Sequence, residues 1–326
     1  MNEIHVCPST LKAGYETYSP SAKRHLLGGK KVSHILPYKS LSSGAGLAEN
    51  KGHLSLSGAQ EKYSAVIDDG VFRLTEDNER GTYILKPKLT GFDNREYSPA
   101  NENLTMQIAS QVYRIPTADN SLCFTGDGEQ VYVTRRYDVQ ADGTRIQQED
   151  LASLAGITKD THGDNYKYDA LDYVDLAAII KRFIPAWPIE LVRYFDLVLF
   201  NFVFANGDAH VKNFSVIKTS QTDYRLTPAY DLINTLLHIP NGEIFALRKG
   251  LYPGWNKNVG AYGSDFLKFG EMIGLDRQTA RAEIDRFCAD YGEIDRLIQN
   301  SFLSEELKEE YRQIYRGRIK YFLKVF

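Results

Sequence analysis

The chain has 326 residues, 43% of them hydrophobic and 25% charged, a composition typical of a soluble protein with two domains or lobes. Its formal net charge of −3 gives no general basic field and argues against a nucleic-acid-binding protein. Cys7, Cys123 and Cys288 are few and widely spaced, which indicates reduced thiols in the cytoplasm and excludes a disulfide framework.

No membrane segment is predicted. The N-terminus lacks the apolar stretch of a signal peptide. The most apolar segment, residues 189–205, contains Glu190, Arg193 and Asp196, which a membrane span should not contain. We therefore predict a cytoplasmic protein in which this segment is a buried helix.

Residues 1–50 show little periodicity, with a loop predicted at 42–46, and the first clear pattern follows them. The small residues Ser57, Gly58 and Ala59 precede a predicted strand at 63–67, a turn at 68–70 and a returning strand at 71–74. Backbone N–H groups approach phosphate oxygens only where side chains are small, so residues 57–59 are a candidate phosphate-covering loop. An ordinary loop has the same composition, and the pattern alone does not separate the two.

Lys86 ends a short apolar strand predicted at 83–86, and a helix is predicted at 101–112. In protein kinases a strand lysine contacts the α- and β-phosphates of ATP and needs a carboxylate to hold it. Glu102, in the first turn of the helix, is the candidate carboxylate. The alternatives are a surface lysine and an acidic residue favoured by the helix dipole.

The remaining elements follow from hydrophobic periodicity and turn residues. Strands are predicted at 120–124 and 130–135, joined by a turn at 126–128. A helical segment is predicted to open at 147–150 and continue through 151–155, and a loop is predicted at 158–167. Further helices are predicted at 172–183, 189–206 and 305–323, and a hairpin from strands at 214–217 and 224–227.

The segment NGDAHVKNFS, residues 206–215, carries the candidate chemistry. Four residues separate Asp208 from Asn213, as in the kinase catalytic loop, where the Asp is the base and the Asn holds a metal. Asp231 follows the predicted hairpin and completes a set of hard oxygen ligands for Mg²⁺. The Asp–Asn spacing alone arises by chance about once in such a chain. The spacing becomes informative because the chain also has the other kinase elements in the kinase order: a small-residue loop, a strand lysine and a helix glutamate before it, and a later Asp after it.

Two further residues of this segment have open roles. Lys212 is a catalytic candidate that would neutralise the transferred phosphoryl group, or else a solvent-exposed lysine. His210 is a metal ligand or, more commonly, a hydrogen-bonding loop residue. No set of Cys and His residues in the sequence has zinc-ligand spacing, so we expect no zinc. The glycine motifs of the Rossmann and P-loop folds are also absent, so the sequence does not support either fold.

Four motifs together resemble the HipA-like serine/threonine kinases, the toxins of bacterial toxin–antitoxin modules. They are SLSGAQEK at 55–62, YILKP at 83–87, NGDAHVKNFS at 206–215 and YRLTPAYDL at 224–232. The resemblance implies an α+β, two-lobed, protein-kinase-like fold. It places a β-rich N-lobe at residues 1–137 and a mostly helical C-lobe at residues 138–326.

The resemblance also implies residue roles. Asp208 matches the catalytic base, and Asn213 and Asp231 match the Mg²⁺ ligands. The residues implied in ATP binding are Ser57, Gly58, Ala59, Gln60, Glu61, Lys62, Lys86, Glu102, Arg135, Arg136, Tyr137, His210, Val211, Asn213 and Tyr230. Arg135 departs from the family, which has an acidic residue in the hinge. Ser55 or Ser57 matches the autophosphorylated serine, whose added negative charge would repel ATP.

The chain resembles the short, HipT-like branch, which lacks the N-terminal subdomain of longer members. The implied partners are a protein substrate such as an aminoacyl-tRNA synthetase, a helix-turn-helix antitoxin and a separate small protein equivalent to the missing subdomain. DNA is expected only indirectly, through the antitoxin. Two alternatives remain open: a small-molecule kinase of the aminoglycoside type, and a nucleotide-binding pseudokinase that acts as a partner module.

Overall fold

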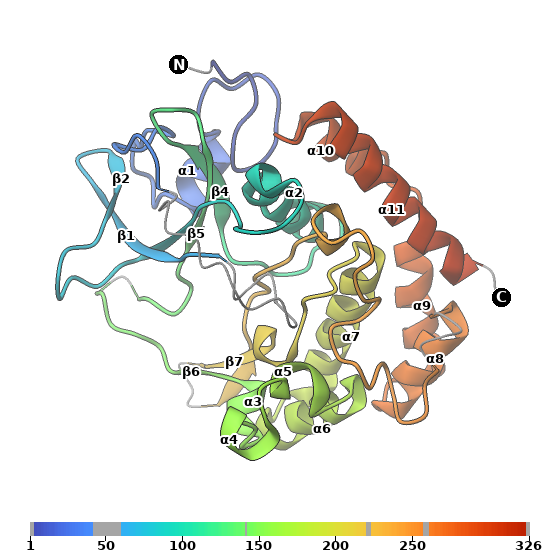
Figure 1. Cartoon of the computed structure of the whole chain (residues 1–326). Coiled ribbons are helices and arrows are strands. Elements are labelled where there is room, and N and C mark those ends of the chain that lie inside the picture. Colours follow the sequence, from blue (N-terminus) through green and yellow to red (C-terminus); the bar gives the residue numbers. More distant parts are fainter. Residues whose placement is uncertain (1–2, 42–59, 141, 220–222, 257–260, 324–326) are drawn as a thin grey trace. The chain divides into compact units, whose positions relative to one another are not determined.

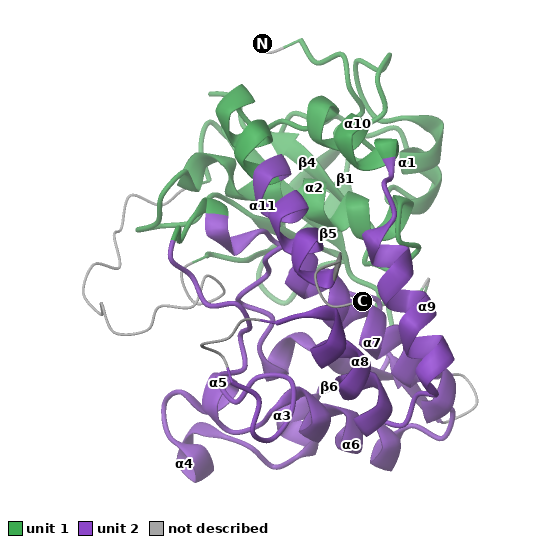
Figure 2. Cartoon of the chain, turned by 90° about the vertical axis from the view of Figure 1, so that its right-hand side faces the viewer, with its two compact units in different colours: residues 1–145, 237–240, 292–311 green, residues 146–236, 241–291, 312–326 purple. Residues whose placement is uncertain are grey.

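The computed structural model describes residues 3–41, 60–140, 142–219, 223–256 and 261–323 (Figure 1). The chain divides into two compact units (Figure 2). The first comprises residues 1–145, 237–240 and 292–311, and the second comprises residues 146–236, 241–291 and 312–326. The predicted loop at 42–46 and the predicted site residues Ser55, Ser57, Gly58 and Ala59 lie outside the described residues.

The first unit is built on a five-stranded antiparallel sheet with the order β2-β1-β3-β5-β4 (Figure 1). Its strands are β1 (Tyr63–Asp68), β2 (Val71–Leu74), β3 (Tyr83–Lys86), β4 (Asn120–Phe124) and β5 (Gln130–Arg135). These bounds confirm the predicted strands. In the β1–β2 turn, Asp69 and Gly70 both have positive φ, 44° and 73°, a conformation that aspartate and glycine tolerate well.

The two faces of this sheet have different partners. Leu85 and Val133 belong to a hydrophobic cluster that the N-terminal segment covers. Because side chains alternate along a strand, Lys86 and Tyr132 lie on the opposite face. There Lys86 pairs with Glu102 of helix α2 (Ser98–Gln111).

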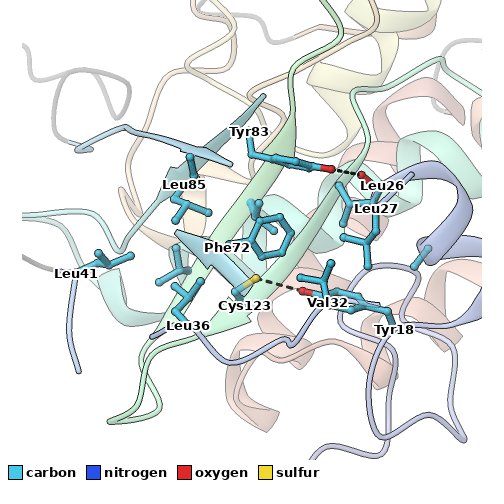
Figure 3. Packing of buried hydrophobic residues seen from close by; sticks show 14 of the residues in the cluster. Tyr18, Leu26, Leu27, Val32, Leu36, Leu41, Phe72, Tyr83, Leu85 and Cys123 are labelled. Carbon is cyan, nitrogen blue, oxygen red and sulfur yellow. Dashed lines mark hydrogen bonds between the residues drawn. The ribbon is translucent and has the colours of Figure 1, made fainter. Parts of the chain in front are cut away.

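The N-terminal segment, which includes α1 (Pro20–His25), completes the core of the first unit (Figure 3). The Tyr83 hydroxyl donates to the carbonyl oxygen of Leu26 at 2.7 Å. The Tyr18 hydroxyl lies 3.2 Å from Sγ of Cys123 on β4. Residues 3–41, which have no clear sequence pattern, are therefore part of the folded unit.

Helix α2 begins at Ser98, earlier than predicted, because Pro99 is well suited to the first helical turn. The prediction that Glu102 lies in the first turn is therefore wrong, since Glu102 is the fifth residue of the helix. Helix α10 (Gly292–Asn300) packs against it. At the start of α11 (Glu305–Leu323), the Tyr311 hydroxyl lies 2.9 Å from Oγ1 of Thr105 on α2. Segments distant in sequence thus close the first unit around α2.

The second unit is mostly helical and contains a small sheet with the order β6-β7-β8 (Figure 1). Its strands are β6 (Gln148–Asp150), β7 (Ser215–Lys218) and β8 (Tyr224–Leu226). Its helices are α3 (Leu151–Leu154), α4 (Lys159–His162), α5 (Tyr166–Asp169), α6 (Tyr173–Phe183), α7 (Trp187–Val203), α8 (Gly263–Met272) and α9 (Arg277–Cys288). The predicted long helices and the predicted hairpin are confirmed, with α7 ending three residues early.

The prediction that a helix opens at 147–150 is wrong. Residues Gln148–Asp150 form strand β6, which pairs with β7, and the helix begins only at Leu151. The Asp150 side chain caps that helix by accepting the Ser153 N–H at 2.9 Å. Pairing with a strand far along the chain overrides the polar, helix-compatible composition of this segment.

The predicted loop at 158–167 is also wrong in part, because it contains α4 and the start of α5. Thr158 and Thr161 form a reciprocal capping box around α4. Such one-turn helices are stabilised by local capping hydrogen bonds and bury no regular apolar face. Hydrophobic periodicity in the sequence therefore does not reveal them.

Helix α7 is largely buried, and its charges are paired. Glu190 contacts Arg193 at 2.8 Å, and Asp196 contacts Arg286 of α9 at 2.6 Å. Within the described ranges, no helix combines the length and apolarity that crossing a membrane requires.

Candidate active site

The candidate catalytic loop follows α7 directly. Ala205 has a φ of 53°, which ends the helix, and the Asn206 N–H donates to the Asn201 carbonyl at 2.8 Å. Thr235 fixes both sides of this junction. Its N–H and its hydroxyl each donate to the Ala205 carbonyl at 2.9 Å, and the hydroxyl accepts the Gly207 N–H at 3.1 Å.

Gly207 leaves no room for a side chain. A Cβ atom at this position would lie 2.7 Å from the carbonyl oxygen of Glu243 and 3.1 Å from Oγ1 of Thr235. The first of these contacts is with backbone, which cannot rotate away. Glycine is therefore required for the loop to pack against residue 243.

Asn206 joins the two segments that carry the predicted metal ligands. Its Nδ2 donates to the Asp231 backbone carbonyl at 3.3 Å and to Oδ1 of Asn201 at 3.0 Å. Its Oδ1 accepts the Asp208 N–H at 3.4 Å. Because Asn206 is 2% exposed, water competes little for these bonds. One side chain thus ties the backbones of Asp208 and Asp231 together.

Asp208 is 8% exposed and is oriented by neighbours within the second unit. The Tyr168 hydroxyl of α5 donates to its Oδ1 at 2.8 Å. Its backbone carbonyl accepts Nδ2 of Asn213 at 3.0 Å and the His210 N–H at 2.7 Å. The loop therefore folds back on itself with the carboxylate held in one direction.

Asn213 and Asp231 have the chemistry of a magnesium site. Because Nδ2 of Asn213 donates to the Asp208 carbonyl, its Oδ1 is directed away from that bond. Asp231 is half-buried and has a left-handed backbone, with a φ of 55°. Such strain is common at functional sites. An amide oxygen and a carboxylate are ligands that Mg²⁺ accepts beside water and phosphate oxygens, so these residues fit the ion.

Within the described ranges, no group of three or more His, Cys, Asp or Glu side chains is arranged to hold a metal ion. A magnesium ion at Asn213 and Asp231 would therefore take the rest of its ligands from water and from phosphate oxygens.

His210 is buried beside the candidate base. Its ring packs edge-on to the ring of Tyr168, with centroids 5.3 Å apart. Neither ring nitrogen has a hydrogen-bond partner among the described residues. Burial, with the positive charge of Lys167, lowers the pKa of His210 to about 4. The neutral imidazole can thus hydrogen-bond a ligand, but it cannot supply positive charge to a phosphoryl group at neutral pH.

The flanking residues of the loop hold its shape. Val211 is 1% exposed. Nζ of Lys212 lies 3.5 Å from Oδ2 of Asp150, the cap of α3. The Tyr230 hydroxyl donates to the Lys212 carbonyl at 2.9 Å and lies 2.6 Å from Oγ of Ser215. Lys212 therefore has an acidic neighbour, and its catalytic role stays a prediction.

The first unit brings Lys86 and Glu102 together. Nζ of Lys86 lies 2.6 Å from Oε1 of Glu102, and the two side chains are 5% and 4% exposed. The ammonium group also lies 5.2 Å from the centre of the Tyr132 ring. A buried ion pair needs several favourable contacts to offset the loss of hydration, and the aromatic ring supplies one of them.

The predicted hinge residues have partners of their own in the first unit. The Arg135 guanidinium donates to the His25 carbonyl at 2.8 Å. Arg136 donates to both carboxylate oxygens of Asp138, at 3.0 and 2.7 Å. Tyr137 is half-buried. These contacts neither require nor exclude a nucleotide at the hinge.

The described end of the predicted phosphate loop lies beside the strand lysine. Nε2 of Gln60 donates to the Pro87 carbonyl at 2.8 Å, next to Lys86 in sequence. Oε2 of Glu61 accepts the Tyr63 hydroxyl at 2.6 Å, and Lys62 is exposed. Gln60, at the described end of this predicted loop, is therefore bonded to the residue that follows Lys86.

Sequence reasoning missed two residues of the site, Asn206 and Tyr168. Asn206 has a weak signal, a polar residue directly after the apolar segment that ends at Ala205. Tyr168 has none, because it lies at the edge of the predicted loop at 158–167 and contacts a residue forty positions later.

A family model described as the HipA-like C-terminal domain matches residues 54–293. Three relatives are named as kinases. A Haemophilus influenzae protein named "Putative kinase" is 25% identical over 93% of this chain and 91% of its own length. Two Sinorhizobium fredii proteins with the same designation are 31% and 27% identical, and the matches cover 48% and 59% of their lengths. The chain thus spans about half of these two longer relatives.

Two solved structures are similar in fold. One is a chain of the Shewanella oneidensis toxin–antitoxin complex of HipA, HipB and operator DNA, with a TM-score of 0.68 at 20% identity. The match covers 86% of the present chain and 68% of the Shewanella chain. The other is the Helicobacter pylori proinflammatory kinase CtkA, with a TM-score of 0.50 at 16% identity, and the match covers 80% of the present chain and 94% of CtkA. The chain therefore has a kinase-like α+β fold, which confirms the predicted fold class.

Proposed function

Because this chain belongs to the HipA-like C-terminal domain family, we propose that it is an ATP- and Mg²⁺-dependent kinase that phosphorylates serine or threonine residues of a protein. The observation that carries the proposal is the link through Asn206, which ties Asp208 and Asp231 into one site. A phosphoryl-transfer site needs a base and metal ligands held in register. Relatives named as kinases support the same reading.

In this proposal Asp208 orients the acceptor hydroxyl and takes its proton. The Tyr168 hydroxyl holds one carboxylate oxygen, so the carboxylate is prepared before the substrate arrives. Asn213 and Asp231 would hold the magnesium ion, which, when bound, neutralises charge on the ATP phosphates. His210 would contact the nucleotide as a neutral hydrogen-bonding group.

Lys86 would contact the α- and β-phosphates of ATP. Its ion pair with Glu102 supports this role, since a fixed ammonium group positions phosphates better than a mobile one. The division into functional lobes at residue 137 stays a prediction, as do the contacts of Gln60, Glu61, Lys62 and the 135–137 hinge with ATP.

We further propose that the kinase inactivates itself at Ser55 or Ser57. A phosphoserine adds close to two negative charges, which would repel ATP from a loop that covers its phosphates. The position of Gln60 beside Pro87 supports this, because it brings the described end of that loop to the strand of Lys86.

The biological role is proposed as that of a cytoplasmic toxin of a bacterial toxin–antitoxin module. A structurally similar HipA chain was solved with HipB and operator DNA, which supports a helix-turn-helix antitoxin as the partner. The proposed substrate is a component of translation such as an aminoacyl-tRNA synthetase. A separate small protein equivalent to the N-terminal subdomain is a further proposed partner.

Quantitative phosphoproteomics tests the substrate class. Cells that express the wild-type chain are compared with cells that express Asp208→Gln. We expect serine or threonine phosphosites on one or a few proteins in the wild-type sample alone. Growth arrest that persists in Asp208→Gln, with no difference in phosphosites, would favour a pseudokinase. Phosphorylation of an aminoglycoside and of no protein would favour the small-molecule kinase.

A further inference from the structure

A cavity of about 770 Å³ lies within the first unit, between the N-terminal segment, the end of α2 and the start of β4. None of its lining residues takes part in the proposed kinase chemistry. Its volume is in the range of sites that bind small molecules. The cavity therefore needs an explanation of its own.

The charge of the lining is strongly positive. Lys12, Arg24, Arg114 and Arg296 face one carboxylate, that of Asp119. The whole chain carries a net charge of −3, so this concentration of cations is not a general property of its surface. Hydroxyl groups add neutral donors, from Thr10, Ser19, Ser21, Ser110 and Thr117. Cations among hydroxyl donors match the oxygens of an anionic ligand.

The guanidinium group of Arg24 is not used by the fold. Arg24 lies in the last turn of α1, where a cation commonly satisfies helix carbonyls. Here the His25 carbonyl accepts from Arg135 at 2.8 Å, and the Leu26 carbonyl accepts from Tyr83 at 2.7 Å. Arg24 is exposed, and its side chain makes no hydrogen bond or ion pair within the described part of the chain.

Arg114 occupies a strained position at the end of α2. Its φ is 56°, in the left-handed region where helices usually end on glycine. An L-residue there costs about 1 kcal/mol compared with glycine. Among the described side chains, Arg114 forms no ion pair within 4.0 Å, although its charge acts on the Glu293 carboxylate, which pairs with Arg296. Backbone strain is found at functional sites, so a strained arginine in the lining of a basic cavity is a candidate binding residue.

Part of the polar lining is already hydrogen-bonded within the fold. Nε2 of Gln107 donates to Oδ1 of Asn120 at 3.0 Å, and the Ser9 hydroxyl donates to the Asn120 carbonyl at 2.8 Å. Nε2 of Gln111 donates to the Thr10 carbonyl at 2.9 Å. These polar side chains of the lining are therefore held in place by the fold, while the cations Arg24 and Arg114 stay available to a ligand.

We propose that this cavity binds a small hydrophilic ligand that carries phosphate groups, held by the guanidinium groups of Arg24 and Arg114 and by the surrounding hydroxyls. The planar guanidinium donates two parallel hydrogen bonds to phosphate oxygens, which suits arginine to this ligand. The guanidinium group of Arg296 already pairs with Glu293, so we expect it to contribute less to binding the ligand.

Calorimetric titration of the full chain with inorganic pyrophosphate, in excess EDTA, tests the proposal. EDTA removes magnesium and so weakens pyrophosphate binding at the proposed ATP site. We expect the wild type to bind, and Arg24→Gln and Arg114→Gly each to weaken binding about tenfold or more. Lys30→Gln, an exposed cation outside the cavity, serves as the matched control and should bind like the wild type.

Arg114→Gly also separates binding from folding. Glycine suits a φ of 56°, so this variant should melt no lower than the wild type while it loses affinity. No heat from the wild type up to about 5 mM pyrophosphate would overturn the proposal. Equal affinity in the arginine variants would also overturn it, as would loss of binding in Asp231→Asn alone. Equal binding of citrate would replace phosphate with carboxylate as the ligand class.

Discussion

The hydroxyl of Tyr168 donates a hydrogen bond of 2.8 Å to Oδ1 of Asp208, the candidate catalytic base. Tyr168 is itself held by Arg248, whose N–H donates to the Tyr168 carbonyl at 2.9 Å and whose guanidinium lies 5.9 Å from its ring centre. The same guanidinium contacts Asp169 at 2.9 Å. A tyrosine held at its backbone and at its ring thus orients the carboxylate.

Replacing Tyr168 with phenylalanine should lower kcat about tenfold with little change in the KM for ATP. The variant keeps the ring against His210 and removes only the hydroxyl. A hydrogen bond to a charged group contributes about 1.5 kcal/mol or more, which corresponds to about a tenfold change in rate. Steady-state kinetics with a protein substrate measures both constants. Tyr166→Phe is the matched control, because the Tyr166 hydroxyl makes no hydrogen bond among the described residues. Equal kcat in both variants would contradict the positioning role.

The buried pair of Lys86 and Glu102 should show strong coupling in a double-mutant cycle. Glu102→Gln removes the carboxylate that faces the buried ammonium of Lys86 and should lower the free energy of unfolding by about 3 kcal/mol. The double variant Lys86→Met, Glu102→Gln should cost less than the sum of the single variants Lys86→Met and Glu102→Gln. Urea unfolding measures each value. Simple additivity would show that the pair does not interact in solution.

An exposed ion pair provides the comparison for that cycle. Arg281 and Asp285 on α9 lie four positions apart and are 43% and 57% exposed. Replacing either should change the free energy of unfolding by about 0.5 kcal/mol or less. The contrast separates the effect of burial from that of charge pairing.

His210 should make the fold sensitive to acid. Burial lowers its pKa from 6.5 to about 4, so between these pH values the unfolded chain binds a proton that the folded chain does not. The free energy of unfolding should therefore fall as the pH drops from 6.5 toward 4, by about 3 kcal/mol from this group. Above pH 6.5 the group contributes no pH dependence.

Urea titrations at several pH values measure the contribution of His210. The His210→Gln variant should show a flatter decline between pH 6.5 and 4 than the wild type. His162→Gln, a change at an exposed residue of α4, should follow the wild type. A slope in His210→Gln that equals the wild-type slope would contradict the assignment.

Gly207→Ala should lower kinase activity strongly while the protein still folds. The new Cβ would press on the Glu243 carbonyl at 2.7 Å, so the loop of Asp208 must shift. Such a shift costs about 1–3 kcal/mol in stability and misplaces the base. Gly317→Ala, where no atom lies within 4 Å, should stabilise α11 and leave activity unchanged. Wild-type activity in Gly207→Ala would show that the loop tolerates movement.

The elements that could be predicted from the sequence are those with local signals. The β1–β2 hairpin follows from Asp69-Gly70, and α11 follows from its helical hydrophobic period. Strand β6 was not predictable because its partner, β7, lies more than sixty residues later. Likewise the spacing of Asp208 and Asn213 is visible in the sequence. The hydrogen bond from Tyr168 depends on tertiary packing, which no local pattern encodes.

The central claim is that Asp208 serves phosphoryl transfer from ATP. The most direct measurement is the transfer of label from γ-labelled ATP, with Mg²⁺, to the purified chain, followed by phosphopeptide mass spectrometry. We predict that the wild type acquires label at Ser55 or Ser57 and that Asp208→Gln acquires none. Absence of transfer in the wild type, or equal labelling of the two proteins, would contradict it.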